Sequence, residues 1–267
     1  MAIELGTADI NDATSSDLTE NTVLPGKADP NGTNAGGPID VNLGQLIYGS
    51  NTGSIVIDRE QAASVGSDQG IAIGNGASVN SSIAADSIAI GRNASASQKD
   101  SVILGLSATG DSNNAVAIGD NTISAGKCVA LGSEASAQGG SGCVAIGKQA
   151  ATTADETLAV GEGAAANAQS SIAILKGRAN GVDSFAAGRG VVASGISSFA
   201  AVGETNSNTE ASGDYSIALG LNAKAKNINS IAIGRLNTVS GTRTICLGLA
   251  NSDGNGFDDG IVIGKGS

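Results

Sequence analysis

The sequence has no histidine or tryptophan, one methionine, three prolines, three cysteines and only 2% aromatic residues in 267. Without histidine, His-based catalytic triads and histidine metal sites are excluded. The few aromatic residues leave little for a thick core or for a platform that stacks single-stranded nucleic acid. The net charge of −11 also disfavours nucleic acid, because phosphate binding depends on clustered Lys and Arg.

Targeting and membrane signals are not evident either. The N-terminal stretch MAIELGTADINDATSSD has no basic region followed by an apolar core, so it does not read as a secretory signal. No apolar run approaches the ~18 residues that a membrane helix needs. We therefore expect a chain that does not cross a membrane by the general route, or a fragment of a longer one. Three cysteines without metal-type spacing do not indicate a disulfide framework.

Glycine is abundant, with 40 residues, and many glycines close one repeated phrase of three small or branched apolar residues. Such self-similarity decides the fold before any other signal. Successive phrases lie 13 to 17 residues apart, and one variant ends on Leu175 instead of glycine. The closing glycines are Gly74, Gly91, Gly105, Gly119, Gly132, Gly147, Gly161, Gly188, Gly203, Gly220, Gly234, Gly248 and Gly264.

Each repeat predicts two strands and two turns. After the apolar phrase comes a second half that alternates, as in Ala94-Ser95-Ala96-Ser97, which indicates one buried and one solvated face. Two strands in ~14 residues make one coil of a parallel β-solenoid, with coils stacked at ~4.8 Å in a rod of about 65 Å. We predict an all-β chain with a β-roll domain over residues 46–267, regular from about residue 66. Residues 1–45 carry no repeat and hold all three prolines, so we interpret them as a docking arm, with a disordered tail as the alternative.

A strand that is apolar at successive positions is buried on both faces, because neighbouring side chains point to opposite sides. We expect the first and third residues of each phrase to fill the coil and the central residue to contact a sister chain. The alternative is a monomeric solenoid with an alanine-lined face. The predicted coil core contains Ile88, Ile90, Ile118, Ile146, Ile172, Ile217, Ile231 and Ile233. The predicted self-association surface contains Ala72, Ala89, Ala117, Ala130, Ala145, Ala159, Ala218, Ala232 and Cys246.

The phrase resembles the head repeat of YadA-type trimeric autotransporter adhesins, which reads roughly Asn-Ser-Val-Ala-Ile-Gly, two residues, then Ser or Ala, one residue, Ala. Asp86-Ser87-Ile88-Ala89-Ile90-Gly91-Arg92-Asn93-Ala94-Ser95-Ala96 matches this pattern almost throughout, and the resemblance extends over about 200 residues. It implies a left-handed parallel β-roll assembled as a homotrimer, with the alanine column at the trimer interface and surface attachment as its role.

The chain departs from those adhesins, because no secretion signal, stalk or membrane anchor is evident and its non-repetitive segment is N-terminal. That polarity is common in phage tail fibres and spikes. Our first interpretation is therefore a fibre of a phage virion. It would dock on other virion proteins through residues 1–45 and contact a host-surface receptor. The alternative is the head of an adhesin on the bacterial cell surface. An ice-binding solenoid is a third possibility, disfavoured by the lack of a regular threonine ladder.

We expect no enzymatic activity and no cofactor, because no serine lies in a nucleophile elbow and the Gly-x-Gly pairs fall in turns. Oxygen ligands gather at Asp253, Asn255, Asp258 and Asp259, which are weak candidates for a calcium site, although a Gly/Asp turn fits this segment better. Candidate receptor-contact residues, in the places where the repeat length changes, are Asp214, Asp253, Phe257 and Asp258. Cys128 and Cys143 occupy equivalent positions in neighbouring coils, and we expect free thiols there.

Overall fold

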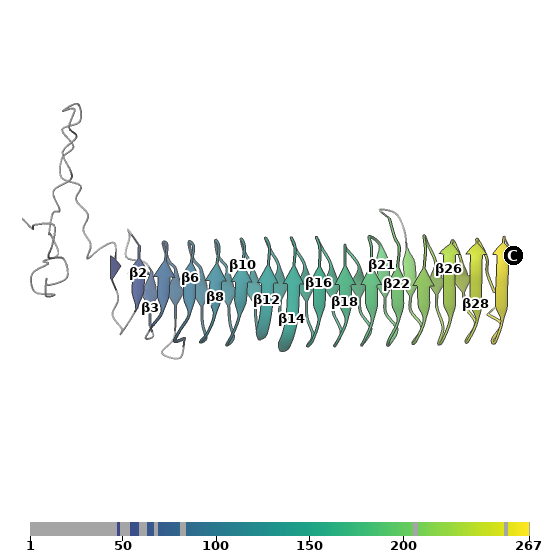
Figure 1. Ribbon diagram of the computed structural model, residues 1–267, viewed down its shortest axis with the longest axis horizontal. Helices are drawn as coiled ribbons and strands as arrows, with labels where there is room; N and C mark the ends of the chain where they lie inside the picture. The colour runs from purple at the N-terminus through teal and green to yellow at the C-terminus, as the bar shows by residue number, and fades with distance from the viewer. Residues whose placement is uncertain are drawn as a thin grey trace, which may run out of the picture.

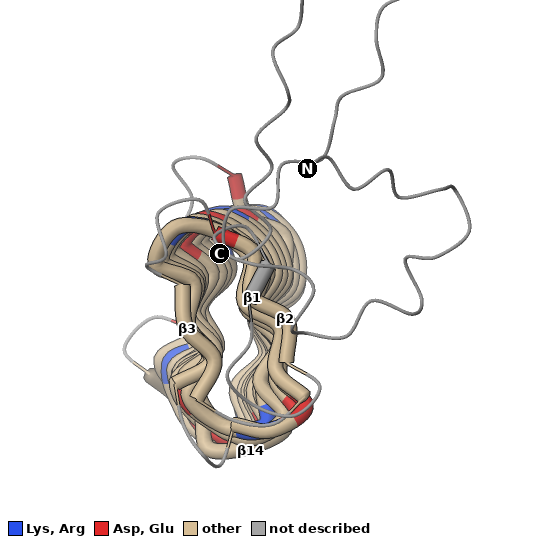
Figure 2. Tube along the Cα trace, turned by 90° about the vertical axis from the view of Figure 1, so that its left-hand side faces the viewer, with Lys and Arg blue, Asp and Glu red and all other residues tan. Residues whose placement is uncertain are grey.

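The computed structural model describes residues 47–48, 54–58, 63–66, 69–80, 84–204, 208–253 and 256–266. The docking arm predicted over residues 1–45 lies outside these residues. The described chain is a β-solenoid whose strands follow one another along a single long axis (Figure 1). Viewed along that axis, the coils superpose into a closed oval outline (Figure 2). The predicted all-β parallel solenoid with coils of about 14 residues is confirmed, and the described residues contain no helix.

Two sheets form the long walls of the solenoid, and from β2 to β27 each coil contributes one strand to each wall. Sheet A is parallel except for the antiparallel pair of β1 and β2, so the parallel ladder begins at Ile55, earlier than the predicted start of the regular coils. The strands of sheet A are β1 (Ile47–Tyr48), β2 (Ile55–Ile57), β4 (Ile71–Ile73), β6 (Ile88–Ile90), β8 (Val102–Leu104), β10 (Val116–Ile118), β12 (Lys127–Leu131), β14 (Ser141–Ile146), β16 (Leu158–Val160), β18 (Ile172–Ile174), β20 (Phe185–Ala187), β22 (Phe199–Ala201), β24 (Ile217–Leu219), β26 (Ile231–Arg235), β28 (Ile245–Leu249) and β29 (Ile261–Lys265). The strands of sheet B are β3 (Ser64–Val65), β5 (Ser78–Val79), β7 (Ser95–Ala96), β9 (Thr109–Gly110), β11 (Ile123–Ser124), β13 (Ser136–Ala137), β15 (Ala151–Thr152), β17 (Ala165–Ala166), β19 (Arg178–Ala179), β21 (Val191–Ala193), β23 (Thr209–Ala211), β25 (Lys224–Ala225) and β27 (Thr238–Val239).

The interior of the coil is lined by small side chains from both sheets. In the coil that begins at β6, the inward residues are Ser87 and Ala89 from the first wall and Ala94 and Ala96 from the second, and all four are fully buried. The Ser87 hydroxyl donates a hydrogen bond of 2.9 Å to the Gln98 carbonyl in the following turn. Small residues at alternate positions thus let the two sheets close on each other, and in this coil the buried Ser87 hydroxyl has a hydrogen-bond partner.

This arrangement corrects the predicted coil core, because the flanking isoleucines point outward and the central alanine points inward. Ile90 is 37% exposed, whereas Ala89 between it and Ile88 is fully buried. The physical reason is volume: a coil of about 14 residues encloses a space that methyl groups fill, and two columns of isoleucine would not fit. The residues wrongly assigned to the core, all partly or largely exposed, are Ile88, Ile90, Ile118, Ile146, Ile172, Ile217, Ile231 and Ile233.

One coil shows how tightly this volume is set. The central position of β8 holds Ile103, which is fully buried and the largest of the fully buried side chains. Sheet B carries Gly110 in the same coil, where the preceding coil has Ala96. A methyl group built on Gly110 would overlap Ile103 Cδ1 and lie 3.2 Å from Ala115 Cβ. A larger residue in one wall is therefore matched by a smaller one in the other.

We predict that Gly110→Ala lowers the free energy of unfolding by about 2 kcal/mol, because overpacking a closed core costs that much. Ile103→Ala should largely suppress this effect, since the double variant restores the Ala89 and Ala96 pairing of the preceding coil. A double-mutant cycle by urea unfolding measures the coupling. Additive effects of the two substitutions would show that their side chains do not meet inside the coil.

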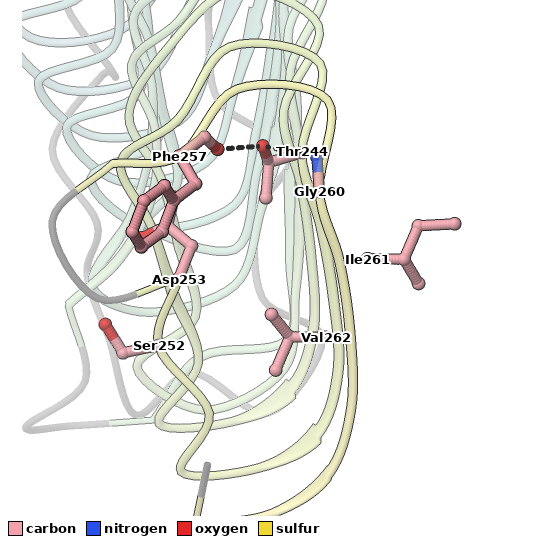
Figure 3. Close-up of a pocket in the computed structure, with 7 residues that line it drawn as sticks. All are labelled: Thr244, Ser252, Asp253, Phe257, Gly260, Ile261 and Val262. Carbon is pink, nitrogen blue, oxygen red and sulfur yellow. Dashed lines mark hydrogen bonds between the residues drawn. The ribbon is translucent and has the colours of Figure 1, made fainter.

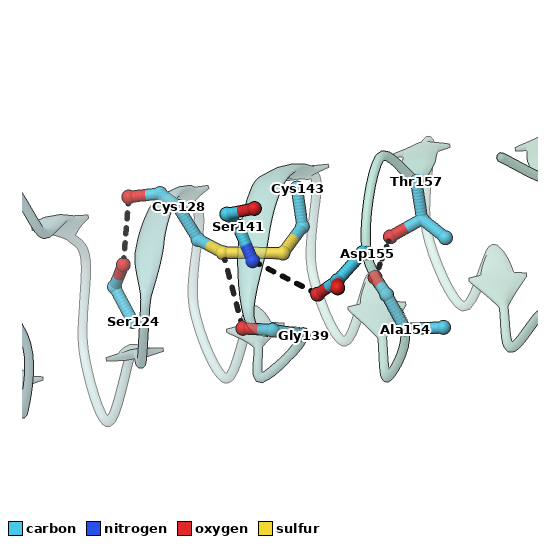
Figure 4. Close-up of a disulfide and its surroundings, with 8 residues drawn as sticks. All are labelled: Ser124, Cys128, Gly139, Ser141, Cys143, Ala154, Asp155 and Thr157. Carbon is cyan, nitrogen blue, oxygen red and sulfur yellow. Dashed lines mark hydrogen bonds between the residues drawn. A yellow bond between two sulfur atoms is a disulfide. The ribbon is translucent and has the colours of Figure 1, made fainter. Parts of the chain in front are cut away.

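A disulfide joins Cys128 in β12 to Cys143 in β14, which makes the expectation of free thiols at these positions wrong (Figure 4). Both side chains are buried, and the two Cα atoms are 4.7 Å apart. The register between the two strands shifts after Lys127, since Lys127 pairs with Ser141 but Val129 pairs with Val144. Uniform in-register stacking, on which the expectation rested, therefore does not hold at this point. The disulfide links neighbouring coils through the solenoid interior.

Candidate functional site

The outer surface of sheet A is an apolar face that runs along the solenoid. It consists of two columns, defined by the residues immediately before and after the central residue of each phrase from β2 to β29. Every residue of both columns is apolar, and none is buried. The first column contains Ile55, Ile71, Ile88, Val102, Val116, Val129, Val144, Leu158, Ile172, Phe185, Phe199, Ile217, Ile231, Ile245 and Ile261. The second column contains Ile57, Ile73, Ile90, Leu104, Ile118, Leu131, Ile146, Val160, Ile174, Ala187, Ala201, Leu219, Ile233, Leu247 and Ile263.

The prediction that the central residues of the phrases form the self-association surface is wrong, because the flanking residues face outward. All of its members are fully buried inside the coil of a single chain and cannot contact a second chain. They are Ala72, Ala89, Ala117, Ala130, Ala145, Ala159, Ala218, Ala232 and Cys246. Burial raises the pKa of the Cys246 thiol, and the nearby Asp253 carboxylate raises it further. We therefore expect Cys246 to react slowly with thiol reagents whether or not the chain associates, because the coil of a single chain already covers it.

The outer surface of sheet B has a different character. Its ladder positions, starting at Ser64 in β3 and ending at Thr238 in β27, mix hydroxyl, charged and apolar residues, with Arg178, Glu210 and Lys224 among them. Threonine occupies only two of the thirteen outward positions that pair along this ladder, Thr109 and Thr238. The regular threonine ladder expected of an ice-binding surface is not present on these described strands.

The acidic segment near the C-terminal end is organised as a turn that braces the preceding coil. Asp253 Oδ2 accepts the Ser240 N–H at 2.8 Å and also the Gly241 N–H. Asp258 Oδ1 accepts the Thr242 N–H at 2.7 Å. These carboxylates are thus directed at backbone donors, as the Gly/Asp-turn interpretation predicts.

Asp259 makes an ion pair with Arg243 of the preceding coil, with Nε–Oδ1 and Nη2–Oδ2 distances of 2.5 and 2.8 Å. The hydrogen bond from Arg243 lowers the pKa of Asp259 below its usual value, and Asp259 in turn raises the pKa of Arg243. Among the described residues, no group of three or more His, Cys, Asp or Glu side chains is placed to hold a metal ion. Asn255, the fourth candidate ligand, lies outside these residues.

Phe257 is one of the exposed candidate receptor-contact residues, with 72% of its surface accessible. It lines a pocket between the acidic turn and β29, into which Val262 also points, whereas Ile261 points away (Figure 3). The Thr244 hydroxyl donates to the Phe257 carbonyl at 2.6 Å and fixes the turn. Asp214 is placed similarly to Asp253, since its Oδ1 accepts the Ile196 N–H at 2.9 Å. Receptor contact at Asp214, Asp253, Phe257 and Asp258 stays a prediction.

Comparison with known families identifies the repeat. Residues 82–108, 211–237 and 225–248 match the model of the YadA head domain repeat. These segments contain β6 to β8, β24 to β27 and most of β28, so the sheet A strands within them match YadA-type head repeats, as the sequence resemblance predicts. A search of curated proteins finds no match to the chain. None of the described residues forms a helix long and apolar enough to cross a membrane.

Proposed function

We propose that this chain of YadA-type head repeats assembles through its apolar face into a homotrimeric rod that serves as a non-enzymatic structural and attachment protein. The apolar face of sheet A carries the proposal. Its 15 strands at ~4.8 Å spacing, each covering about 10 Å with three residues at a rise of ~3.3 Å, give an area of about 700 Å². Monomeric proteins seldom expose an apolar patch of more than about 600 Å². The area is also close to the ~800 Å² that each partner buries in a standard interface.

The number three follows from the resemblance to YadA-type heads, and the face is compatible with it. A cyclic assembly about an axis parallel to the rod presents the apolar face of every copy to that axis. Sheet B, with Arg178, Glu210 and Lys224 on its outer side, then faces solvent. The assembly therefore separates an apolar interior from a polar exterior, which a single solenoid cannot do.

Two observations favour the bacterial cell surface as the location. The matched repeats are of the type found in surface adhesins. The Cys128–Cys143 disulfide fits an oxidising environment, since disulfides persist in extracellular and surface proteins. The alternative is a virion fibre that docks on other virion proteins through residues 1–45 and contacts a host receptor. Its rod would be the same, but it would be attached to a phage particle and not to a bacterial cell. Immunogold labelling of intact cells and of purified phage particles separates the two locations.

The association face is tested by two substitutions within one coil. Ile118 lies on the apolar face and is 38% exposed, whereas Ile123 lies on the outer side of sheet B and is 36% exposed. We predict that Ile118→Asp weakens self-association at least ~10-fold, equivalent to about 1.4 kcal/mol, because it places a charge in an apolar interface. Ile123→Asp should leave it unchanged. Sedimentation velocity over a concentration series measures both, and equal effects would contradict the assignment of the face.

Attachment itself is tested with the assembled rod. Beads coated with the purified chain should bind host cells, and deletion of residues 252–259 should reduce binding if the acidic turn contacts the receptor. If the chain assembles but the beads bind no cells, the proposed rod assembly would still hold and the proposed attachment role would be refuted.

A further inference from the structure

Two coils interrupt the regular apolar face, and their two columns change in opposite directions. Phe185 and Phe199 replace the aliphatic residues of the first column. In the second column, Ala187 and Ala201 stand where all the remaining coils have isoleucine, leucine or valine. The two phenylalanine rings stack, with centroids 4.8 Å apart and planes 4° from parallel. The face thus carries an aromatic ridge two coils high beside a notch of the same height.

Two exposed apolar residues also lie next to the notch. Leu175 follows β18 and Val202 follows β22, at the strand end where other coils have glycine. Both adopt positive φ, 52° and 69°, a conformation that branched and bulky residues rarely take. Both are nevertheless largely exposed in the single chain, at 65% and 63%. Apolar side chains held in an unfavourable conformation and left in water indicate a surface that a partner covers.

We propose that a second copy of this chain covers the notch, with Phe185 and Phe199 of one copy packing over Ala187 and Ala201 of its neighbour in the same coil. The inference rests on the proposed self-association and goes further, because it fixes the orientation and height of the neighbour. A rotation about an axis parallel to the rod keeps each coil at its own height. It also brings the first column of one copy beside the second column of the next.

The compensation in volume matches this geometry. Only a parallel, unstaggered neighbour places a large first-column residue beside a small second-column residue at both coils. A stagger of one or more coils would move Phe185 or Phe199 against an isoleucine, leucine or valine of the second column, where overpacking is unfavourable. The ridge and notch therefore set the axial register of the rods, which a uniform face of isoleucines leaves weakly specified.

The test uses disulfide trapping between two singly substituted chains that are assembled together and differ in length by a tag. One pair, Ile172→Cys with Ile174→Cys, places the thiols in neighbouring columns at the same height. The control pair, Ile172→Cys with Leu219→Cys, separates them by three strands, about 14 Å. The native cysteines do not interfere, because Cys128 and Cys143 are joined and Cys246 is buried. We expect at least ~10-fold more cross-linked dimer from the same-height pair.

The same measurement is then repeated on a uniform face, with Phe185, Ala187, Phe199 and Ala201 all changed to isoleucine, the residue of other coils. We expect this variant to associate but to lose the preference, so that the ratio falls below ~3. Equal yields from both pairs on the native face would overturn the proposal, as would an unchanged ratio on the uniform face. Sedimentation of the unsubstituted chain reports self-association separately, and a monomer there would refute the proposed function together with this inference.

Discussion

Gly132→Ala is expected to lower the free energy of unfolding by about 3 kcal/mol, because the added methyl group meets both an unfavourable φ and the backbone of the next coil. Gly132 follows β12 with φ of 125°, where an L-residue is strained. A Cβ built there lies 2.8 Å from both the carbonyl carbon and the carbonyl oxygen of Gly147 in the next coil. These are backbone atoms, so neighbouring coils must separate to make room.

Gly163→Ala is the matched control for this substitution. Gly163 also has positive φ, 65°, but the atom nearest to an added Cβ is Lys176 Cγ at 3.8 Å. Only the backbone strain remains, and the expected loss is about 1 kcal/mol. Guanidinium unfolding at fixed chain concentration measures both variants. Similar losses would mean that the glycine column is required for its φ angle and not for the stacking of the coils.

Ala145→Ile is expected to lower the free energy of unfolding by about 3 kcal/mol or to prevent folding of the surrounding coils. Ala145 is the central residue of its phrase and is fully buried between the two sheets. It pairs with Ala130 and Ala159 in the neighbouring coils, so a larger side chain finds no free volume along the column either. Because each coil contacts only its neighbours, the damage should be local and detectable by hydrogen exchange.

Val144→Ile is the control in the same strand, since Val144 lies in the outward first column, where other coils already carry isoleucine. The expected change is within about 0.5 kcal/mol. If Val144→Ile were the more damaging of the two substitutions, the orientation of sheet A would be the reverse of that described.

The repeat, the two strands of each coil and the parallel stacking were all predictable from the sequence, because glycine spacing and apolar periodicity determine them. Which side of the Ile-Ala-Ile strand faces inward was not, since both sides are apolar and period-two alternation is symmetric. A signal was nonetheless present in side-chain volume. Ser87, Ala89, Ala94 and Ala96 form one alternating set of small residues through both halves of the coil, and this set is what the narrow interior accommodates.

Some features of the candidate site were likewise predictable from the sequence, and others were not. The turn role of Asp253 and Asp258 was predictable from local glycine and aspartate chemistry. The Cys128–Cys143 disulfide was not, because it depends on a shift of register that appears only when the two strands are paired. The ridge formed by Phe185 and Phe199 was missed because the phrases that contain it look merely irregular in the sequence. It can be recognised as a packing feature only when the structure places Ala187 and Ala201 beside it on the same face.

The central claim is that the apolar face of sheet A is an interface between copies of this chain. Sedimentation equilibrium of the unsubstituted, oxidised chain at micromolar concentration tests it most directly. The account predicts a single species of three times the chain mass of 25.7 kDa. A single species of 25.7 kDa that stays in solution with its apolar face exposed would contradict it.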